Sequence, residues 1–113
     1  MQCIKKQDAI IHVHSPSCSV VEYPTNGSEM SIAIATVTGR YPDAGYAINH
    51  KCTEMGYILK GSGKLVTAMQ EQMLAEGDVV YIPIGEKYYW EGTLTILLPT
   101  APAWSLEQHE VKN

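Results

Sequence analysis

Residues 48–63 read INHKCTEMGYILKGSG, and this stretch decides how the chain is interpreted. It places a histidine, a cysteine and a glutamate, His50, Cys52 and Glu54, within five residues, and a short apolar run follows. Gly61 and Gly63 then predict a tight turn. Ligand-type side chains beside a strand and a turn are typical of a cluster that points into a cavity. The stretch therefore predicts both β-structure and a candidate site.

The rest of the chain consists of short β-prone segments separated by turn residues. Residues 30–38, MSIAIATVT, alternate almost strictly, and both faces are largely apolar, as expected for a strand inside a closed barrel or sandwich. Other segments rich in β-branched or aromatic residues are bounded by glycine or proline, which predicts further strands. These are residues 8–14, 19–23, 46–50, 57–60, 64–67, 79–82 and 94–98.

Two segments have helix-forming character. Residues 68–76, AMQEQMLAE, are good helix formers, but their short length between strands favours a hairpin that turns near residues 70–72. Ser105 and Gln108 fit a capping box, which predicts a short C-terminal helix over residues 105–111. Many short strands with almost no helix predict an all-β barrel or jelly roll.

Composition and charge exclude several classes of protein. A length of 113 residues suits one domain. The net charge of −4 argues against a nucleic-acid partner, which requires a basic face. The sequence contains no run of about 18 apolar residues, so we expect no membrane span. The N-terminus has no secretory signal pattern. The three cysteines contain no CxxC pair, which favours free thiols in a reducing cytoplasm over a disulfide framework or a structural zinc site.

Two segments resemble the motifs of the cupins. Residues 54–63, EMGYILKGSG, resemble the second half of the first cupin motif, E-x-x-Y-V-L-x-G-x-G, and residues 77–85, GDVVYIPIG, resemble the second motif. The resemblance extends over about residues 30–110. It implies one cupin domain over residues 1–113, a double-stranded β-helix or jelly-roll barrel with a short C-terminal helix. Because small cupins are usually dimers, it also implies a homodimer.

The resemblance implies an incomplete set of metal ligands. Cupins commonly hold a divalent metal through histidines and a glutamate. Aligned on Glu54, the first-motif histidine positions fall at Ile48 and His50, and the second-motif histidine falls at Tyr88. A metal such as Ni, Zn, Mn or Fe would then be held by His50, Glu54 and Tyr88. One imidazole and one carboxylate are few for a tight catalytic site, and a tyrosine would ionise at neutral pH only beside a metal already bound.

A metal-free pocket is the second alternative. Residues two apart on a strand face the same side, so His50 is expected to point into the barrel if Ile48 does. The polar groups of this pocket would be His50, Glu54 and Tyr88, which are also the candidate catalytic residues because imidazole and carboxylate groups exchange protons near neutral pH. The predicted walls are Ile48, Ile58, Ile82 and Trp90. In a third alternative, His50 and Glu54 only bond each other in the core.

The sequence thus predicts a cupin that binds a small molecule, either carbohydrate-like or a small acid. The alternative is a cupin enzyme, either an isomerase or lyase that uses acid–base chemistry or a metal-dependent oxygenase with an atypical metal site. His12 and His14 share one face of a strand and are expected to be structural or edge residues, and His109 is expected at the surface. No Ser-His-Asp arrangement, phosphate loop or nucleotide fingerprint is visible.

Overall fold

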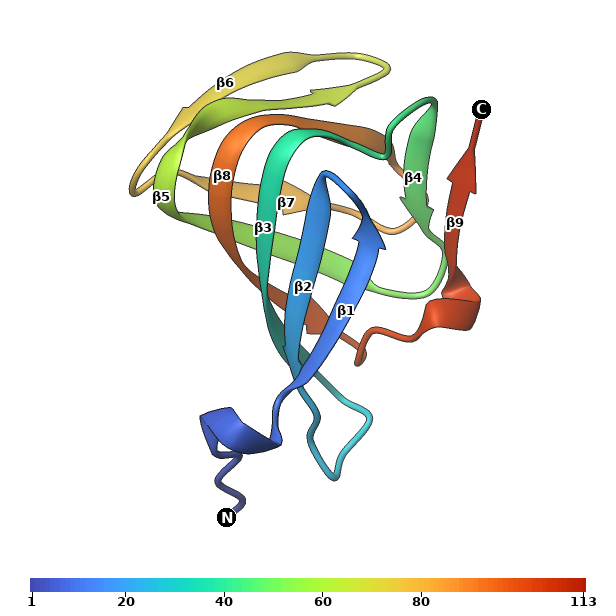
Figure 1. The fold of residues 1–113 in the computed structure, drawn as a ribbon. Helices are drawn as coiled ribbons and strands as arrows, with labels where there is room; N and C mark the ends of the chain where they lie inside the picture. Colours follow the sequence, from blue (N-terminus) through green and yellow to red (C-terminus); the bar gives the residue numbers. More distant parts are fainter.

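The computed structural model describes residues 1–113, whose strands form a single curled antiparallel sheet (Figure 1). The strands are β1 (Ile10–Ser15), β2 (Cys18–Tyr23), β3 (Ser31–Tyr41), β4 (Tyr46–Asn49), β5 (Thr53–Thr67), β6 (Glu71–Ala75), β7 (Val79–Ile82), β8 (Lys87–Ala101) and β9 (His109–Lys112). Two short 3-10 turns, η1 (Lys6–Asp8) and η2 (Leu106–Gln108), complete the elements. The predicted all-β jelly-roll class is confirmed. No helix in the structure has the length and apolar character needed to cross a membrane.

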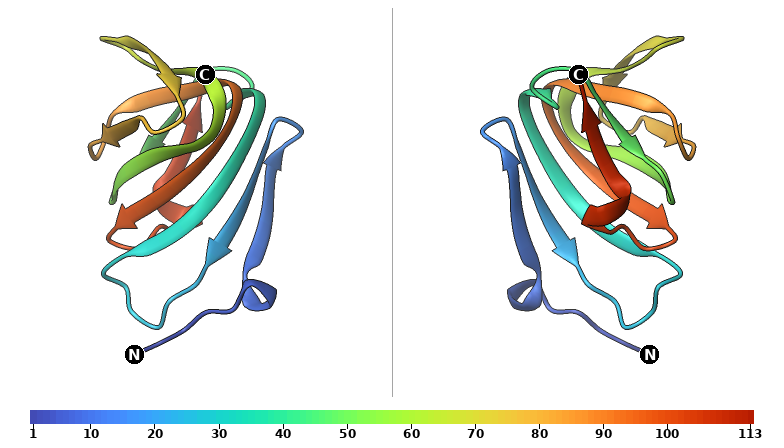
Figure 2. Two further views of the ribbon diagram at one scale, coloured as in Figure 1. Left: turned by 90° about the vertical axis from the view of Figure 1, so that its left-hand side faces the viewer. Right: turned by 90° about the vertical axis from the view of Figure 1, so that its right-hand side faces the viewer.

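The sheet is organised around β5 and β8, the two longest strands. Its main path runs β1-β2-β3-β8-β4-β9, and β5 pairs with β6, β7 and β8. Curling of the sheet encloses an interior, and the β1–β2 hairpin lies on the opposite side of the molecule from β6 and β7 (Figure 2). The strands therefore turn one face inward around a common space and leave the other face outside.

The predicted alternation of residues 30–38 is confirmed in β3. Ala35 and Val37 are buried, whereas Ile32 and Thr36, on the other face of the strand, are exposed. The hairpin predicted within residues 68–76 also forms. Its turn is closed by a hydrogen bond from the Thr67 N–H to the Gln70 carbonyl, so β6 begins slightly earlier than expected.

The predicted turn at Gly61 and Gly63 is wrong, because both residues lie inside the continuous strand β5. Their role is close approach to β8. A Cβ on Gly61 would lie 2.0 Å from the Thr93 carbonyl oxygen, and one on Gly63 would lie 2.3 Å from that of Glu91. The two glycines therefore let one long strand bend against its neighbour instead of ending it.

The predicted C-terminal helix is also wrong. Residues 106–108 form only one 3-10 turn, and the Ser105 side chain makes no capping hydrogen bond. The chain then continues as β9, which pairs antiparallel with β4. A helix of about seven residues is marginal on its own, whereas pairing with β4 satisfies the backbone groups of both strands.

Apolar side chains fill the interior on the β5 and β8 side. The core cluster includes Ile58, Ile82, Leu94 and Ile96, all at most 1% exposed. Gly56 makes room beside them, since a Cβ there would lie 3.2 Å from the Trp90 ring. The rest of the interior remains open, and aromatic, aliphatic and polar side chains line it.

Candidate functional site

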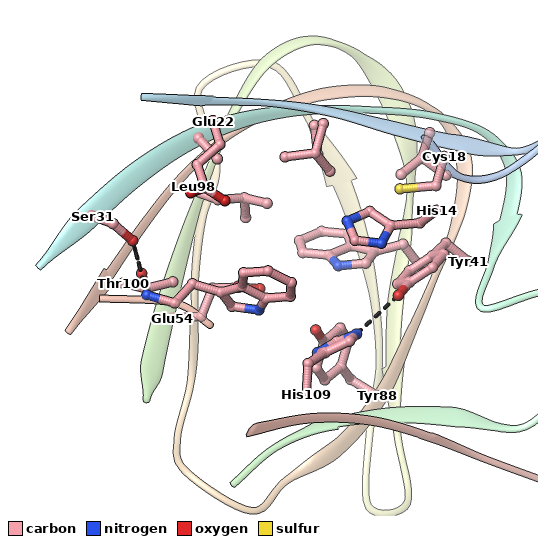
Figure 3. A pocket seen from close by; sticks show the side chains of 16 residues that line it. His14, Cys18, Glu22, Ser31, Tyr41, Glu54, Tyr88, Leu98, Thr100 and His109 are labelled. Atoms are coloured by element: carbon pink, nitrogen blue, oxygen red, sulfur yellow. Dashed lines mark hydrogen bonds between the residues drawn. The ribbon is translucent and has the colours of Figure 1, made fainter. Parts of the chain in front are cut away.

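A pocket opens inside the curled sheet (Figure 3). Its empty space, counted out to the open mouth, is about 650 Å³, of which about 60 Å³ can hold the centres of water molecules. That volume has room for roughly four waters. The lining residues are His14, Cys18, Val20, Glu22, Ser31, Ala33, Ala35, Val37, Tyr41, Glu54, Tyr88, Trp90, Leu98, Thr100, Trp104 and His109.

Strand alternation explains why these residues line the pocket. Even-numbered residues of β1, β2 and β8 and odd-numbered residues of β3 face inward. On β3 the inward positions include Ala33 and Ala35, whose small side chains leave the space open. Glu54 enters from the start of β5, where it pairs with Ile82 of β7 and Thr100 of β8.

Glu54 is a carboxyl group held away from water. The residue is 5% exposed, and burial raises its pKa from 4.5 to about 7. The side-chain amide of Asn49 acts in the opposite direction and lowers this pKa. A carboxyl group with a pKa about 7 is present in both its acid and its base form at neutral pH.

Tyr88 supplies a phenol to the same pocket. Burial raises its pKa well above the ordinary value of 10, and the negative charge of Glu54 raises it further. Tyr88 is 3% exposed and therefore remains a neutral hydroxyl group at physiological pH. It can donate a proton or a hydrogen bond to a ligand that enters the pocket.

A chain of hydrogen bonds fixes the orientation of the side chains beside Tyr88. The Lys51 backbone N–H donates to Gln108 Oε1 over 3.1 Å, so the other end of this amide, Gln108 Nε2, must be the donor. Gln108 Nε2 donates to Asn49 Oδ1 over 3.1 Å. Because Asn49 Oδ1 only accepts, His109 Nδ1, at 2.8 Å, must carry a proton. The backbone of one residue thus determines the tautomer of His109.

The His109 tautomer in turn determines the role of Tyr41. Burial, and to a lesser extent His14, lowers the pKa of His109 to about 4, so its ring is neutral and Nε2 is an acceptor. Tyr41 Oη lies 2.9 Å from Nε2 and donates to it, as drawn in Figure 3. Burial raises the pKa of Tyr41, which keeps this proton in place. The Tyr41 oxygen therefore faces the pocket as an acceptor.

Asn49 leaves one donor without a partner. The residue is 2% exposed, and its Nδ2 atom makes no hydrogen bond. The amide lies near enough to Glu54 and Tyr88 to lower the pKa of both, but not in hydrogen-bonding geometry with either. A buried polar group without a partner is destabilising, and Asn49 is not itself part of the pocket lining.

Aromatic rings gather around the Tyr41–His109 pair. The His14 ring lies 5.8 Å from the Tyr41 ring and 5.9 Å from the Trp104 ring, centroid to centroid. The Trp104 and His109 rings are 5.5 Å apart. Burial and the neighbouring His12 lower the pKa of His14. This cluster gives the pocket flat, uncharged surfaces against which a ring can pack.

Comparison with known proteins identifies the fold. No protein-family model matches the sequence, and no curated protein matches it. Among solved structures, the chain is similar over its full length to Pac13 of Streptomyces, described as a unique nucleoside dehydratase, with 92% of that chain covered, a TM-score of 0.87 and 12% identity. It is also similar to an RmlC-like cupin from Shewanella frigidimarina, with 86% of each chain covered, a TM-score of 0.68 and 19% identity.

The fold is that of the cupins. A third similar structure is the ectoine synthase of P. lautus, with a TM-score of 0.75, 13% identity, and coverage of 100% of this chain and 91% of that one. Variants of Pac13 with a tyrosine replaced by phenylalanine or a histidine replaced by glutamine have been solved with uridine. At these identities the likeness shows the fold alone, and the predicted cupin architecture is confirmed by it.

The structure brings only some of the predicted site residues to this pocket. Glu54, Tyr88 and Trp90 line it as expected. Ile48, Ile58 and Ile82 were predicted as walls, and this is wrong: all three are buried, but they pack in the core and do not line the pocket. The walls of the pocket are formed instead by small, aromatic and polar residues together with Leu98.

The predicted position of His50 in the pocket is wrong. Its side chain is 53% exposed, and Nε2 lies 2.9 Å from Glu110 Oε1 at the surface. The alternative in which His50 bonds Glu54 in the core fails for the same reason. Strand β4 ends at Asn49, so the alternation that would place Ile48 and His50 on one side no longer applies. Asn49 is the buried polar residue at this point.

The pocket residues that sequence reasoning missed include His14, Tyr41 and His109. The alternation of His12 and His14 on a predicted strand was visible in the sequence, but it does not tell which face of the strand is inside. The predicted helix concealed His109, because its position next to β4 depends on the pairing of β4 with β9. Tyr41 lies at the end of β3, beyond the predicted strand.

The residues of this pocket do not fit the divalent metal that proteins of this fold commonly carry. No group of three or more His, Cys, Asp or Glu side chains comes together in the structure. Of the implied ligands, His50 is at the surface with Glu110. Both ring nitrogens of His109 are engaged by Asn49 and Tyr41. The reactive groups of the pocket are therefore its own side chains.

Proposed function

We propose that this cupin binds a small molecule in its pocket and that Glu54 exchanges a proton with it. The observation that carries the proposal is a buried carboxyl group, open to a cavity, whose pKa of about 7 makes both its forms available at neutral pH. General acid–base catalysis is most effective when the pKa of the group lies near the working pH. Structural carboxylates in a protein core are usually paired with a cation, and Glu54 has none.

The reaction class that fits is a lyase or isomerase reaction. The Glu54 carboxylate takes a proton from a carbon next to a carbonyl, and the neutral Tyr88 hydroxyl gives its proton to an oxygen of the same molecule. In a dehydration, the carbon–oxygen bond breaks and this oxygen leaves as water. Transfer of the proton from Glu54 to the Tyr88 phenolate then restores both groups. No change of oxidation state and no co-reactant is needed.

A nucleoside is the first substrate class to test. Support comes from the similarity to a nucleoside dehydratase at a TM-score of 0.87. It also comes from the cluster of His14, Tyr41 and Trp104 rings, which offers flat surfaces for a base.

The test uses proton NMR in D2O on the full-length protein with nucleosides, monosaccharides and small hydroxy ketones. Line broadening reports binding, and loss of a carbon-bound proton signal or appearance of a new product reports chemistry. We expect Glu54→Gln to retain binding and to lose at least 100-fold in the rate of exchange, a loss typical of removing a general base. Glu110→Gln, which changes a surface carboxyl group outside the pocket, should leave both unchanged.

Each outcome has a defined meaning. Exchange that persists in Glu54→Gln would remove Glu54 from the chemistry. Binding without any exchange would favour a binding or sensing module over an enzyme. The absence of binding across the whole panel would overturn the pocket as a small-molecule site.

A further inference from the structure

The pocket is lined by carboxyl groups but by no positively charged side chain. No lysine or arginine is among its lining residues, whereas Glu22 and Glu54 both are. The two lining histidines do not compensate, since burial lowers the pKa of His14 and His109 and favours their neutral forms. An anion that entered would meet carboxylates without a cation to pair with.

Charges behind the walls act in the same direction. Asp43 is exposed and does not line the pocket, but its negative charge contributes to the raised pKa of Cys18 and of Tyr41, as does that of Glu54. Burial is the largest cause of each rise in pKa, and the two carboxylates add to it. Their environment is thus negative as well as dry.

The neutral polar groups mostly offer acceptors. The Tyr41 hydroxyl donates its proton to His109 in a hydrogen bond, so the Tyr41 oxygen can only accept from a ligand. Ser31 and Thr100 bond each other over 2.7 Å, and Ser31 Oγ also accepts from the Trp104 backbone N–H over 3.0 Å. With the two carboxylates, the pocket therefore presents several acceptors to a ligand. The donors that remain in the lining include the Tyr88 hydroxyl and the one hydroxyl proton that the Ser31–Thr100 pair does not use.

Glu22 is in a position to influence which molecules the pocket binds. It projects inward from β2 and lines the pocket, and its side chain is 21% exposed, more than that of the buried Glu54. Its Oε2 atom lies 3.6 Å from His12 Nε2, a ring at the surface and outside the pocket lining. Figure 3 shows Glu22 near Leu98, on the β2 and β8 side of the cavity. Glu22 is therefore the more solvated of the two carboxyl groups that a ligand in the pocket would face.

We propose that the pocket selects neutral or cationic molecules rich in O–H or N–H groups and rejects their phosphorylated or carboxylated counterparts, with Glu22 as a specificity-determining residue. This inference rests on the proposed function and narrows it: of the two ligand classes that the sequence suggested, the hydroxylated compound is retained and the small acid is excluded. Like charges brought together in a space of low dielectric repel strongly, and an acceptor-rich surface pairs with donors.

Matched ligands separate charge from shape. Isothermal titration calorimetry at about pH 8, above the pKa of Glu54 of about 7, compares uridine with uridine 5′-phosphate. It also compares glucose with glucose 6-phosphate and glucosamine. We expect at least one neutral compound to bind at least 10-fold more tightly than its phosphate, and the amine to bind no more weakly than its neutral parent.

Two charge-matched variants locate the effect. Glu22→Lys should bring the phosphate to within threefold of the neutral compound or tighter. Glu29→Lys makes the same charge change at an exposed position outside the pocket and should keep the 10-fold preference. Thermal melting of each variant verifies that it is folded, and Glu22→Gln replaces Glu22→Lys if that variant does not fold, with an expected loss of at least half of the preference on a logarithmic scale.

The outcomes distinguish this inference from the function on which it rests. A phosphate that binds the wild type as tightly as its neutral parent overturns the selection by charge and leaves the small-molecule pocket in place. Equal effects of Glu22→Lys and Glu29→Lys overturn the role of Glu22, because the net charge of the molecule would then explain the preference. If no compound of any set binds, the proposed function fails and this inference fails with it.

Discussion

At the scale of single residues, Glu54 links the stability of the fold to pH. Its pKa rises from 4.5 in water to about 7 because burial disfavours the charged form. The native state therefore retains this proton over a pH range in which the unfolded chain has already released it. The resulting stabilisation is full below pH 4.5 and is lost as the pH rises through about 7.

We expect Glu54→Gln to remove this pH dependence. From pH 4.5 to about pH 8, the wild type should lose on the order of 3 kcal/mol of unfolding free energy relative to the variant, since one pKa unit corresponds to about 1.4 kcal/mol. Urea denaturation of both proteins at several pH values measures the difference. His109 also makes the stability depend on pH, because its pKa of about 4 makes the native state lose stability as the pH falls below 6.5. This contribution is the same in the wild type and in the variant, so it cancels in the difference between them. A pH-independent difference would contradict the raised pKa of Glu54.

Gln108 provides a second prediction at this scale. Its amide accepts from the Lys51 backbone N–H and donates to Asn49, and this order of donors fixes the tautomer of the His109 ring. Replacement by leucine leaves the Lys51 N–H without its acceptor and frees Asn49 to rotate. We expect Gln108→Leu to lose about 1–3 kcal/mol of stability, the usual cost of a buried polar group without a partner. It should also convert the His109 ring from the Nδ1–H form to a mixture of tautomers.

Nitrogen-15 NMR of the imidazole ring reads the tautomer directly, and urea denaturation reads the stability. Gln70→Leu is the control, since Gln70 is exposed in the turn between β5 and β6, and it should change neither readout. A wild-type His109 protonated at Nε2 would contradict the order of donors along the chain.

At the scale of elements, the contact between β5 and β8 depends on glycine. Gly92 has a φ of +134°, and a Cβ there would lie 2.5 Å from the Cα of Gly63, its partner across the two strands. We expect Gly92→Ala to destabilise the fold by more than about 2 kcal/mol, because a strained backbone and a backbone clash add. Urea denaturation measures it.

Gly27→Ala is the matched control for this prediction. A methyl group added at Gly27 would have no atom within 4 Å, and the residue has no positive φ, so its effect should stay within about 0.5 kcal/mol. Equal losses for the two alanine variants would show that glycine at the β5–β8 contact is dispensable.

The elements also explain how far the sequence could predict this molecule. The motifs of residues 54–63 and 77–85 were enough to predict the cupin fold. They were also enough to predict that Glu54, Tyr88 and Trp90 lie in the pocket, because these positions depend on local pattern. His50 and His109 could not be placed in this way. Their positions depend on where β4 stops and on its pairing with β9, about 60 residues away in the chain, and hydrophobic periodicity carries no information about such long-range pairing.

At the scale of the whole molecule, the outer face of the sheet is unusually apolar. The strand registers align one row of apolar side chains across β1, β2, β3, β8, β5 and β7. This row comprises Ile11, Val21, Ile34, Leu97, Tyr57 and Val79. Ile11 is 70% exposed and Val79 is 54% exposed at the two ends of it. Continuous apolar surface of this kind marks an interface.

We propose that a second copy of the chain covers this face, as the resemblance to small cupins implied. The row lies outside the pocket and contains no charged residue, so a self-complementary contact meets no repulsion. Strand β1 also leaves one edge of the sheet without a partner strand, and such edges are usually paired or covered.

The homodimer is tested by light scattering at micromolar concentration, where we expect the mass of two chains. Ile11→Lys places a charge at the exposed end of the row without disturbing the core, and it should weaken dimerisation at least 10-fold because the charge would have to be desolvated. Met69→Lys is the control: Met69 is 92% exposed, more than Ile11, but it lies in the turn between β5 and β6 and off the row, so the dimer should persist. A wild-type monomer, or a loss of dimer in Met69→Lys equal to that in Ile11→Lys, would show that this face is not the contact between two copies.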